Sequence, residues 1–255
     1  MNRVIRDWTG RRVWVIGAST GIGAETARLL LAKGARVALS ARRPELLHAV
    51  ADRHPSALVL PADITRPASL AAAQEAICVQ WQTIDLVLIV AGSYNEMRAE
   101  NFDLAAAHRL IDLNLCGVFN CLAPVLPLLL RQCSGAVGIV ASSAGFSGLP
   151  RALVYGPTKA ALINLAESLY LDLRPRGIGV YLINPGFVET PLTAGNDFPM
   201  PALITAAAAA RQLVQGIEAG QFHIHFPRRF TNWLRLARLL PYSLYFRLVH
   251  KVTGL

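Results

Sequence analysis

The sequence predicts an α/β protein with a doubly wound, seven-stranded parallel sheet and helices on both faces. Short apolar runs alternate along the chain with longer stretches that are rich in Ala and Leu. Most of the short runs are apolar throughout, as expected of strands that are covered on both faces. Repeated strand–helix–strand units imply right-handed crossovers and therefore parallel strands.

Each element follows from a local pattern. Seven short runs have the composition of buried strands, and they cover residues 12–17, 36–40, 58–60, 86–90, 137–141, 180–183 and 222–225. The helical stretches between them cover residues 21–33, 44–53, 67–80, 104–113, 114–130, 153–174 and 201–218. Gly34 is a typical residue just after a helix end, and Pro44 and Pro67 are tolerated in a first helical turn.

The chain of 255 residues fits one large domain, and neither an internal repeat nor a Gly/Ser-rich linker divides it. We therefore predict a dinucleotide-binding and catalytic domain over residues 1–226. Residues 227–255 are predicted to form a basic, amphipathic helical appendage.

Charge and cysteine usage narrow the function classes. The net charge of +9 is uneven, because residues 227–255 hold six Lys and Arg and no Asp or Glu. The positive charge is therefore not spread along the chain in the way that would indicate a nucleic-acid-binding surface. The four cysteines lack metal-site spacing, so we expect buried, reduced thiols and no metal. The first residues lack the apolar core of a secretory signal, and we expect a cytoplasmic protein.

A glycine-rich turn follows the first predicted strand and opens the first helix. Gly17 can make the tight turn, Gly21 lets a backbone approach a pyrophosphate, and Gly23 lets the helix pack close to the strand. The helix start offers free N–H groups to phosphate. The predicted cofactor contacts of this turn are Gly17, Ser19, Thr20, Gly21, Ile22 and Gly23. Glycines here could also serve the turn alone.

The end of the second strand indicates which dinucleotide binds. An NAD site has a carboxylate there for the ribose 2′-hydroxyl, whereas an Arg pairs with a 2′-phosphate. The sequence has Arg42 and Arg43 and no acid, which favours NADP(H) over NAD(H). The two Arg could also be solvated residues before a helix. Asp63, after the third strand, could accept from the adenine amino group or cap a helix.

Tyr155 and Lys159 lie four residues apart and share a helix face. An ammonium stabilises a phenolate, so we expect Lys159 to lower the pKa of Tyr155 and to let it exchange a proton with a substrate oxygen. Ser142, at the end of the fifth strand, can donate to a developing oxyanion. Ser143 competes for that role, and both serines could instead satisfy a turn. Asn114, an amide amid apolar neighbours, is either a helix cap or a functional residue.

Taken together, these motifs resemble the short-chain dehydrogenase/reductase family, in its single-domain branch. The matching pieces cover roughly residues 10 to 190, and they are Gly17-x-x-x-Gly21-Ile-Gly23, Asp63, Ala91-Gly92, Asn114, Ser142, Tyr155-x-x-x-Lys159 and Asn184-Pro-Gly-x-Val-x-Thr190. The resemblance implies a Rossmann-type fold and an oxidoreductase that interconverts a carbonyl and an alcohol. One departure is Ile89-Val90, where the family has two Asn before Ala-Gly.

The resemblance also implies residue roles. Tyr155 would be the general acid/base, Lys159 would tune it and bind the nicotinamide ribose, Ser142 would orient the carbonyl, and Asn114 would hold a relay water. It adds Ala91, Gly92, Pro185, Gly186, Val188 and Thr190 to the cofactor contacts. Pairing through residues 114–130 and 153–174, as in the family, implies a homodimer or homotetramer. The alternative function is a non-catalytic NADP(H)-binding regulator.

The substrate side is predicted to be apolar. Its candidate residues are Phe146, Leu149, Leu153, Phe187 and the segment 192–203 with Phe198 and Met200. A small hydrophobic carbonyl or alcohol is the expected substrate, although apolar lid residues also occur as plain core.

In the tail, Trp233, Leu236, Ala237 and Leu240 recur at helical spacing before Pro241. Such a basic helix packs on a partner subunit or on the core, or lies on a membrane.

Overall fold

A seven-stranded parallel sheet forms the centre of the computed structural model, which describes residues 2–254. The strand order is β3-β2-β1-β4-β5-β6-β9, so the predicted doubly wound fold is confirmed. The strands are β1 (Arg12–Ile16), β2 (Arg36–Ser40), β3 (Ala57–Val59), β4 (Leu86–Ile89), β5 (Ala136–Val140), β6 (Gly179–Pro185) and β9 (His223–Phe226).

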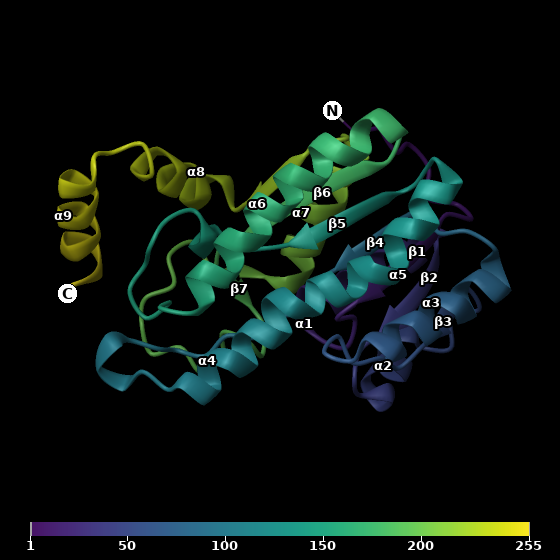
Figure 1. Ribbon diagram of the computed structural model, residues 1–255, viewed down its shortest axis with the longest axis horizontal. Helices are drawn as coiled ribbons and strands as arrows, with labels where there is room; N and C mark the ends of the chain where they lie inside the picture. The colour runs from purple at the N-terminus through teal and green to yellow at the C-terminus, as the bar shows by residue number, and fades with distance from the viewer. Residues whose placement is uncertain (1, 255) are drawn as a thin grey trace.

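Helices cover both faces of this sheet (Figure 1). One face carries α1 (Gly21–Ala32), α2 (Pro44–Ala51) and α7 (Ala206–Glu218), and the other carries α3 (Pro67–Trp81), α5 (Gly117–Gln132) and α6 (Tyr155–Leu173). Side chains alternate between the two cores along each strand. In β1, Val13 and Val15 face α1 and α7, whereas Trp14 faces α3 and α5. All three are fully buried, which explains why the strand is apolar throughout.

The helix boundaries around Asn114 differ from the prediction. We expected two helices that meet there, but α4 (Leu104–Ile111), a π-helical turn (Asp112–Cys116) and α5 run on as one helical stretch. This stretch of 29 residues, Leu104–Gln132, is long and apolar enough to cross a bilayer. Its inner side chains Val118, Cys121, Val125 and Leu129 pack on the sheet, as in the core helix of a globular domain.

Other features of the structure also differ from the prediction. The helix predicted from residue 153 begins at Tyr155. A two-stranded parallel pair, β7 (Val188–Glu189) and β8 (Ile204–Thr205), was not predicted. It joins the two ends of segment 190–203. Burial of all four cysteines was also wrong, since Cys116 and Cys133 are exposed and only Cys121 is buried.

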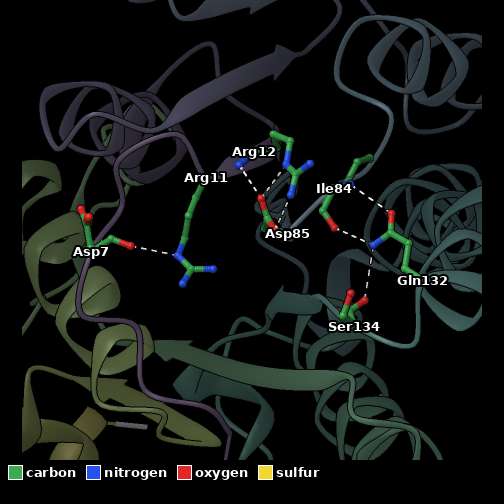
Figure 2. Close-up of polar contacts among 7 residues, drawn as sticks. All are labelled: Asp7, Arg11, Arg12, Ile84, Asp85, Gln132 and Ser134. Carbon is green, nitrogen blue, oxygen red and sulfur yellow. Dashed lines mark hydrogen bonds and ion pairs between the residues drawn. The ribbon is translucent and has the colours of Figure 1, made fainter.

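Polar contacts tie the elements together at the amino-terminal edge of the sheet (Figure 2). Asp85 accepts hydrogen bonds from the Arg12 backbone N–H at 2.8 Å and from its guanidinium at 2.8 and 3.0 Å. Gln132 accepts from the Ile84 N–H at 3.1 Å and donates to its carbonyl at 2.9 Å. These contacts fix the starts of β1 and β4 to each other and to the end of α5.

The last two helices, α8 (Arg228–Ala237) and α9 (Tyr242–Thr253), extend from one end of the molecule (Figure 1). Pro241 separates them, as the sequence predicted. They lie at the end of the molecule opposite β2 and β3. The division of the chain into a domain and an appendage at residue 227 stays a prediction.

Candidate active site

The carboxyl ends of the central strands open into a cleft of about 490 Å³. Every predicted catalytic and cofactor-binding residue lines this cleft except Asn114. They come from loops far apart in the chain, and the parallel sheet brings them to one edge, where ligands of such folds bind. The cleft has a dinucleotide end near α1 and a substrate end near segment 190–203.

The glycine turn has the geometry that its sequence predicted. Gly17 has a φ of +96°, and a side chain there would meet the Ala91 backbone N at 2.5 Å. A Cβ on Gly23 would lie 2.1 Å from the Gly17 carbonyl oxygen. The helix α1 therefore starts against the strand end. Its N-cap residue Thr20 makes no side-chain capping bond, and no acid lies in the first turn, so this helix start suits phosphate.

Arg42 and Arg43 follow β2 and reach the dinucleotide end of the cleft. Asp63 lies nearby and accepts hydrogen bonds from the Thr65 N–H at 2.9 Å and hydroxyl at 2.8 Å. Burial alone would raise the pKa of Asp63, but these bonds and the charges of Arg42 and Arg66 lower it below the ordinary value. Asp63 is not a helix cap, because the N-cap position of α3 is Arg66.

The side chains of Tyr155 and Ser142 both line the middle of the cleft, where Ser142 lowers the pKa of the neighbouring phenol. Ser142 also accepts from the Ala144 N–H at 3.1 Å, so its hydroxyl serves a turn and the cleft together. Lys159 is 4% exposed, and its ammonium donates to the Val140 carbonyl at 3.1 Å. The Lys159 nitrogen lies 5.7 Å from the centre of the Tyr155 ring. The side chains of Tyr155, Lys159 and Ser142 thus lie together in the same part of the cleft.

The pKa values of Tyr155 and Lys159 differ from those that the sequence led us to expect. We expected Lys159 to lower the pKa of Tyr155. Instead, burial raises the pKa of Tyr155, although the neighbouring Ser142 lowers it in part. Burial also lowers the pKa of Lys159 to about 8. Since burial opposes both charged forms, the protein alone holds the phenol protonated. Positive charge from an oxidised nicotinamide would favour the phenolate.

Asn114 lies behind the cleft wall and is fully buried. Its side chain accepts from the Ser93 N–H at 2.8 Å and donates to the Ser93 carbonyl at 2.9 Å. It therefore does not cap a helix. The π-helical turn directs it toward the loop that follows β4. Together with hydrogen bonds from Val90 and Ala91 to the Ile16 carbonyl, at 2.8 and 3.0 Å, it supports the loop in which the family's two Asn are missing.

The substrate end is lined by fewer of the predicted residues. Leu149, Phe187, Leu192 and Phe198 line it, whereas Phe146, Leu153, Met200 and Leu203 do not. Phe146 is buried in the core below α6, and Leu153 points to solvent because α6 has not yet begun there. The regular spacing of apolar residues in helices and strands does not extend into these loops. It therefore could not show which loop side chains face the cleft.

Two aromatic residues of this end were missed by the sequence analysis. Tyr94 lies edge-on to Tyr155, with ring centres 5.2 Å apart, and burial raises its pKa to about 12. Phe230, the third residue of α8, lines the cleft and packs on Phe187 at 5.5 Å. Neither belongs to a motif, and Phe230 had been placed in the appendage. Only the tertiary structure brings it to the site.

Arg151 joins three loops around the mouth of the cleft. It pairs with Glu96 at 3.3 Å and with Asp197, and its guanidinium lies 5.4 Å from the centre of the Phe198 ring. Glu96 follows β4, Arg151 precedes α6, and Asp197 belongs to segment 190–203. The ion pairs therefore hold this segment over the substrate end.

A buried polar chain supports the site from behind. Asn184 is fully buried and contacts both the Ser142 backbone and His223. His223 stacks near His225, which contacts Thr231 and Arg235 of α8. No group of three His, Cys, Asp or Glu side chains among residues 2–254 could hold a metal ion. The histidines are therefore part of a hydrogen-bonded support.

Comparison with known proteins agrees with this geometry. The sequence profile described as short chain dehydrogenase matches residues 11–198. The chain belongs to the short-chain dehydrogenase family. It is 34% identical over 239 residues to an uncharacterized oxidoreductase of Myxococcus xanthus, covering 92% of this chain and 94% of that one. It is 33% identical to a cis-4-hydroxycyclohexanecarboxylate dehydrogenase of Sinomonas cyclohexanicum, covering 78% and 80%.

Solved structures resemble the model as well. A short-chain type dehydrogenase/reductase from Mycobacterium marinum has a TM-score of 0.78 at 25% identity and covers 86% of this chain and 94% of its own. A short-chain dehydrogenase from Streptomyces avermitilis has a TM-score of 0.81 at 20% identity, covering 96% and 98%, which shows the fold alone. Membership in the family makes the chain an oxidoreductase that acts on alcohol or carbonyl groups of small substrates with a nicotinamide cofactor.

Proposed function

We propose that the chain is an NADP(H)-dependent reductase of small hydrophobic carbonyl compounds. The observation that carries this proposal is the meeting of Tyr155, Ser142 and the buried Lys159 in one cleft with an apolar end, with the Lys159 nitrogen 5.7 Å from the centre of the Tyr155 ring. The three groups sit at the carboxyl edge of the sheet, between the phosphate-binding turn and the substrate end.

A nicotinamide held between Lys159 and the residues Pro185, Gly186 and Val188 would supply the hydride for the carbonyl carbon. Ser142 donates a hydrogen bond to the carbonyl oxygen and holds it beside Tyr155. Tyr155 gives its proton to that oxygen as the carbon–oxygen double bond becomes an alcohol. Lys159 stabilises the resulting phenolate until a proton returns from solvent. Because burial raises the pKa of Tyr155, the protein alone holds the acid that a reduction needs.

The dinucleotide end supports NADP(H). The free N–H groups at the start of α1 suit the pyrophosphate, and Arg42 and Arg43 line the place where a ribose 2′-phosphate would lie. No carboxylate stands at the end of β2 to bind a 2′-hydroxyl. Asp63 is held ionised and could accept from the adenine amino group.

The substrate end supports a neutral, apolar compound. Its apolar walls include Tyr94, Leu149, Phe187, Leu192, Phe198 and Phe230, and Thr193 and Asn196 also line the cleft. The described residues that line the cleft include no cation at this end apart from Lys159. Arg151 is engaged with Glu96 and Asp197. The Sinomonas relative is named for an alicyclic alcohol with a carboxylate. We infer that a ring of similar size fits here without the carboxylate.

Replacing Tyr155 with Phe tests the mechanism. The variant should lose at least about 100-fold in kcat, the range of one general acid, and should bind NADPH as the parent does. A panel of apolar aldehydes, ketones, steroids and quinones gives the activity, and fluorescence of bound NADPH gives the affinity. Parent protein that binds NADPH but oxidises it with none of these would instead be the regulator considered above.

The cofactor choice has its own test. Replacing Arg42 and Arg43 with Ala should weaken NADPH about 10- to 100-fold and leave NADH within about threefold, because a charge-assisted bond to phosphate is lost. Replacing the exposed Arg53 with Ala is the matched control. Equal losses for both cofactors would reject the 2′-phosphate assignment.

Assembly and location are also proposals. Exposed apolar side chains on α5 and α6, among them Phe119, Leu130 and Leu171, are consistent with a homodimer or homotetramer. Sedimentation equilibrium gives the mass in solution. The expected location is the cytoplasm.

A further inference from the structure

The two C-terminal helices expose an apolar stripe. On α8, Phe230, Leu234 and Ala237 face the protein, whereas Trp233 and Leu236 face solvent, as does Leu240 just after the helix. Trp233 is 53% exposed and Leu236 is 65% exposed. On α9, the rings of Tyr242 and Phe246 stack 5.6 Å apart and remain exposed. Soluble proteins rarely expose such a patch without a partner.

The same helices carry only positive charge. Arg228, Arg229, Arg235, Arg238, Arg247 and Lys251 lie in this segment without any Asp or Glu. Within residues 2–254, the structure records no ion pair for any of them. The partner of this patch must therefore be anionic as well as apolar.

A second copy of the chain does not meet this requirement. A twofold interface centred on these helices would bring the cations of the two copies together. An anionic bilayer supplies both kinds of contact. Its headgroups attract Lys and Arg, and its interface accommodates Trp and Tyr rings while Leu and Phe reach the acyl boundary.

The segment is also fixed to the substrate end of the cleft. Phe230 of α8 lines the cleft directly. The hydroxyl of Tyr245 on α9 donates to the Gly148 carbonyl at 2.7 Å, and the next residue, Leu149, lines the cleft. The helices that carry the apolar stripe are therefore in direct contact with the substrate end.

We propose that α8 and α9 form a lipid-docking surface that binds an anionic bilayer and holds the substrate end of the cleft beside it. A substrate dissolved in the bilayer then reaches Tyr155 without crossing bulk water. The docking rests on the surface alone, and the delivery of substrate also rests on the proposed function.

Vesicle binding by the full-length protein, without substrate or cofactor, tests the docking. The protein should sediment with vesicles that contain phosphatidylglycerol, bind vesicles of phosphatidylcholine at least about 10-fold more weakly, and be released by salt. Replacing Arg247 and Lys251 with Glu should weaken binding by at least about 10-fold. Replacing Arg36 and Arg211 with Glu, the same change of charge on exposed residues elsewhere, should leave it within about threefold.

Tryptophan emission gives a second readout. Trp8, Trp14 and Trp81 are buried, and Trp233 is the exposed one. Brominated lipids should therefore quench the Trp233 emission alone, and the Trp233→Phe variant should show no quenching. This readout places the stripe in the bilayer, independently of the charge variants.

The proposal is overturned by no binding to anionic vesicles, by equal losses in the two charge-reversal variants, or by quenching that survives Trp233→Phe. It is also overturned if the Arg247/Lys251 variant changes from oligomer to monomer, because a second copy then covers the surface. Vesicle binding by a protein without reductase activity would keep the docking and reject the proposed function.

Discussion

Asn184 Oδ1 accepts a hydrogen bond from the Ser142 backbone N–H at 3.1 Å, although the residues lie 42 positions apart. Since this oxygen is the acceptor, the Asn184 amide nitrogen must donate to His223 Nε2, which lies 2.9 Å away. His223 is therefore neutral here. The contact sets the backbone of Ser142, which lines the cleft with Tyr155, so it links β6 and β9 to the proposed chemistry.

Replacing Asn184 with Ala should lower kcat by about 10- to 100-fold, because small displacements of a positioned group are costly. The KM for NADPH should change little. Stability should fall by about 1–3 kcal/mol, since buried polar groups lose their partners. Replacing Gln132 with Ala, which removes a similar pair of backbone contacts at the far edge of the sheet, should cost stability and spare kcat. Equal kcat in both variants would remove Asn184 from this role.

The neutrality of His223 predicts a pH dependence of stability. Burial, and then the charges of His225 and Arg235, lower the pKa of His223 to about 4 from 6.5. Between these values the unfolded chain binds a proton that the folded protein refuses, so stability falls as pH drops from about 6.5 to about 4. The slope is at most about 1.4 kcal/mol per pH unit for this proton. Urea unfolding of His223→Gln should show a shallower slope, and an unchanged slope would refute the assignment.

The Arg151 ion pairs predict a change in substrate binding more than in fold stability. Replacing Arg151 with Met should raise the KM for the carbonyl substrate about 3- to 10-fold, because segment 190–203 loses its tie to the loop before α6. Stability should change by no more than about 1 kcal/mol, as for other surface pairs. Arg98→Met, which breaks the exposed pair with Glu100, is the control. A fall in kcat with the KM unchanged would contradict this role.

Asp85 predicts a stability effect without an effect on activity. Burial would raise its pKa, but the hydrogen bonds and charge of Arg12 lower it below the ordinary value. The ionised form therefore stabilises the fold above the unfolded pKa, and this contribution is lost as pH falls through the folded one. Asp85→Asn should cost about 1–3 kcal/mol near pH 7 and leave turnover unchanged. Thermal unfolding measures the loss, with Asp52→Asn as the exposed control.

Some features could not follow from local sequence. The helical stretch 104–132 runs through Asn114 because its inner face packs on the sheet, whereas the polar side chain suggested a break. Burial raises the pKa of Tyr155, and the extent of burial depends on tertiary packing that the sequence does not show. Phe230 and Tyr94 reach the cleft from loops and helices that carry no motif.

The sequence by itself determined the alternation of strands and helices along the chain, the glycine turn and the spacing of Tyr155 and Lys159, because these depend on periodicity and on contacts within one turn of chain. Only the tertiary structure decided which loop residues form the substrate end, how Asn184 and His223 hold Ser142, and which side of α8 faces solvent. Those features depend on contacts between residues tens of positions apart, and local patterns do not encode such contacts.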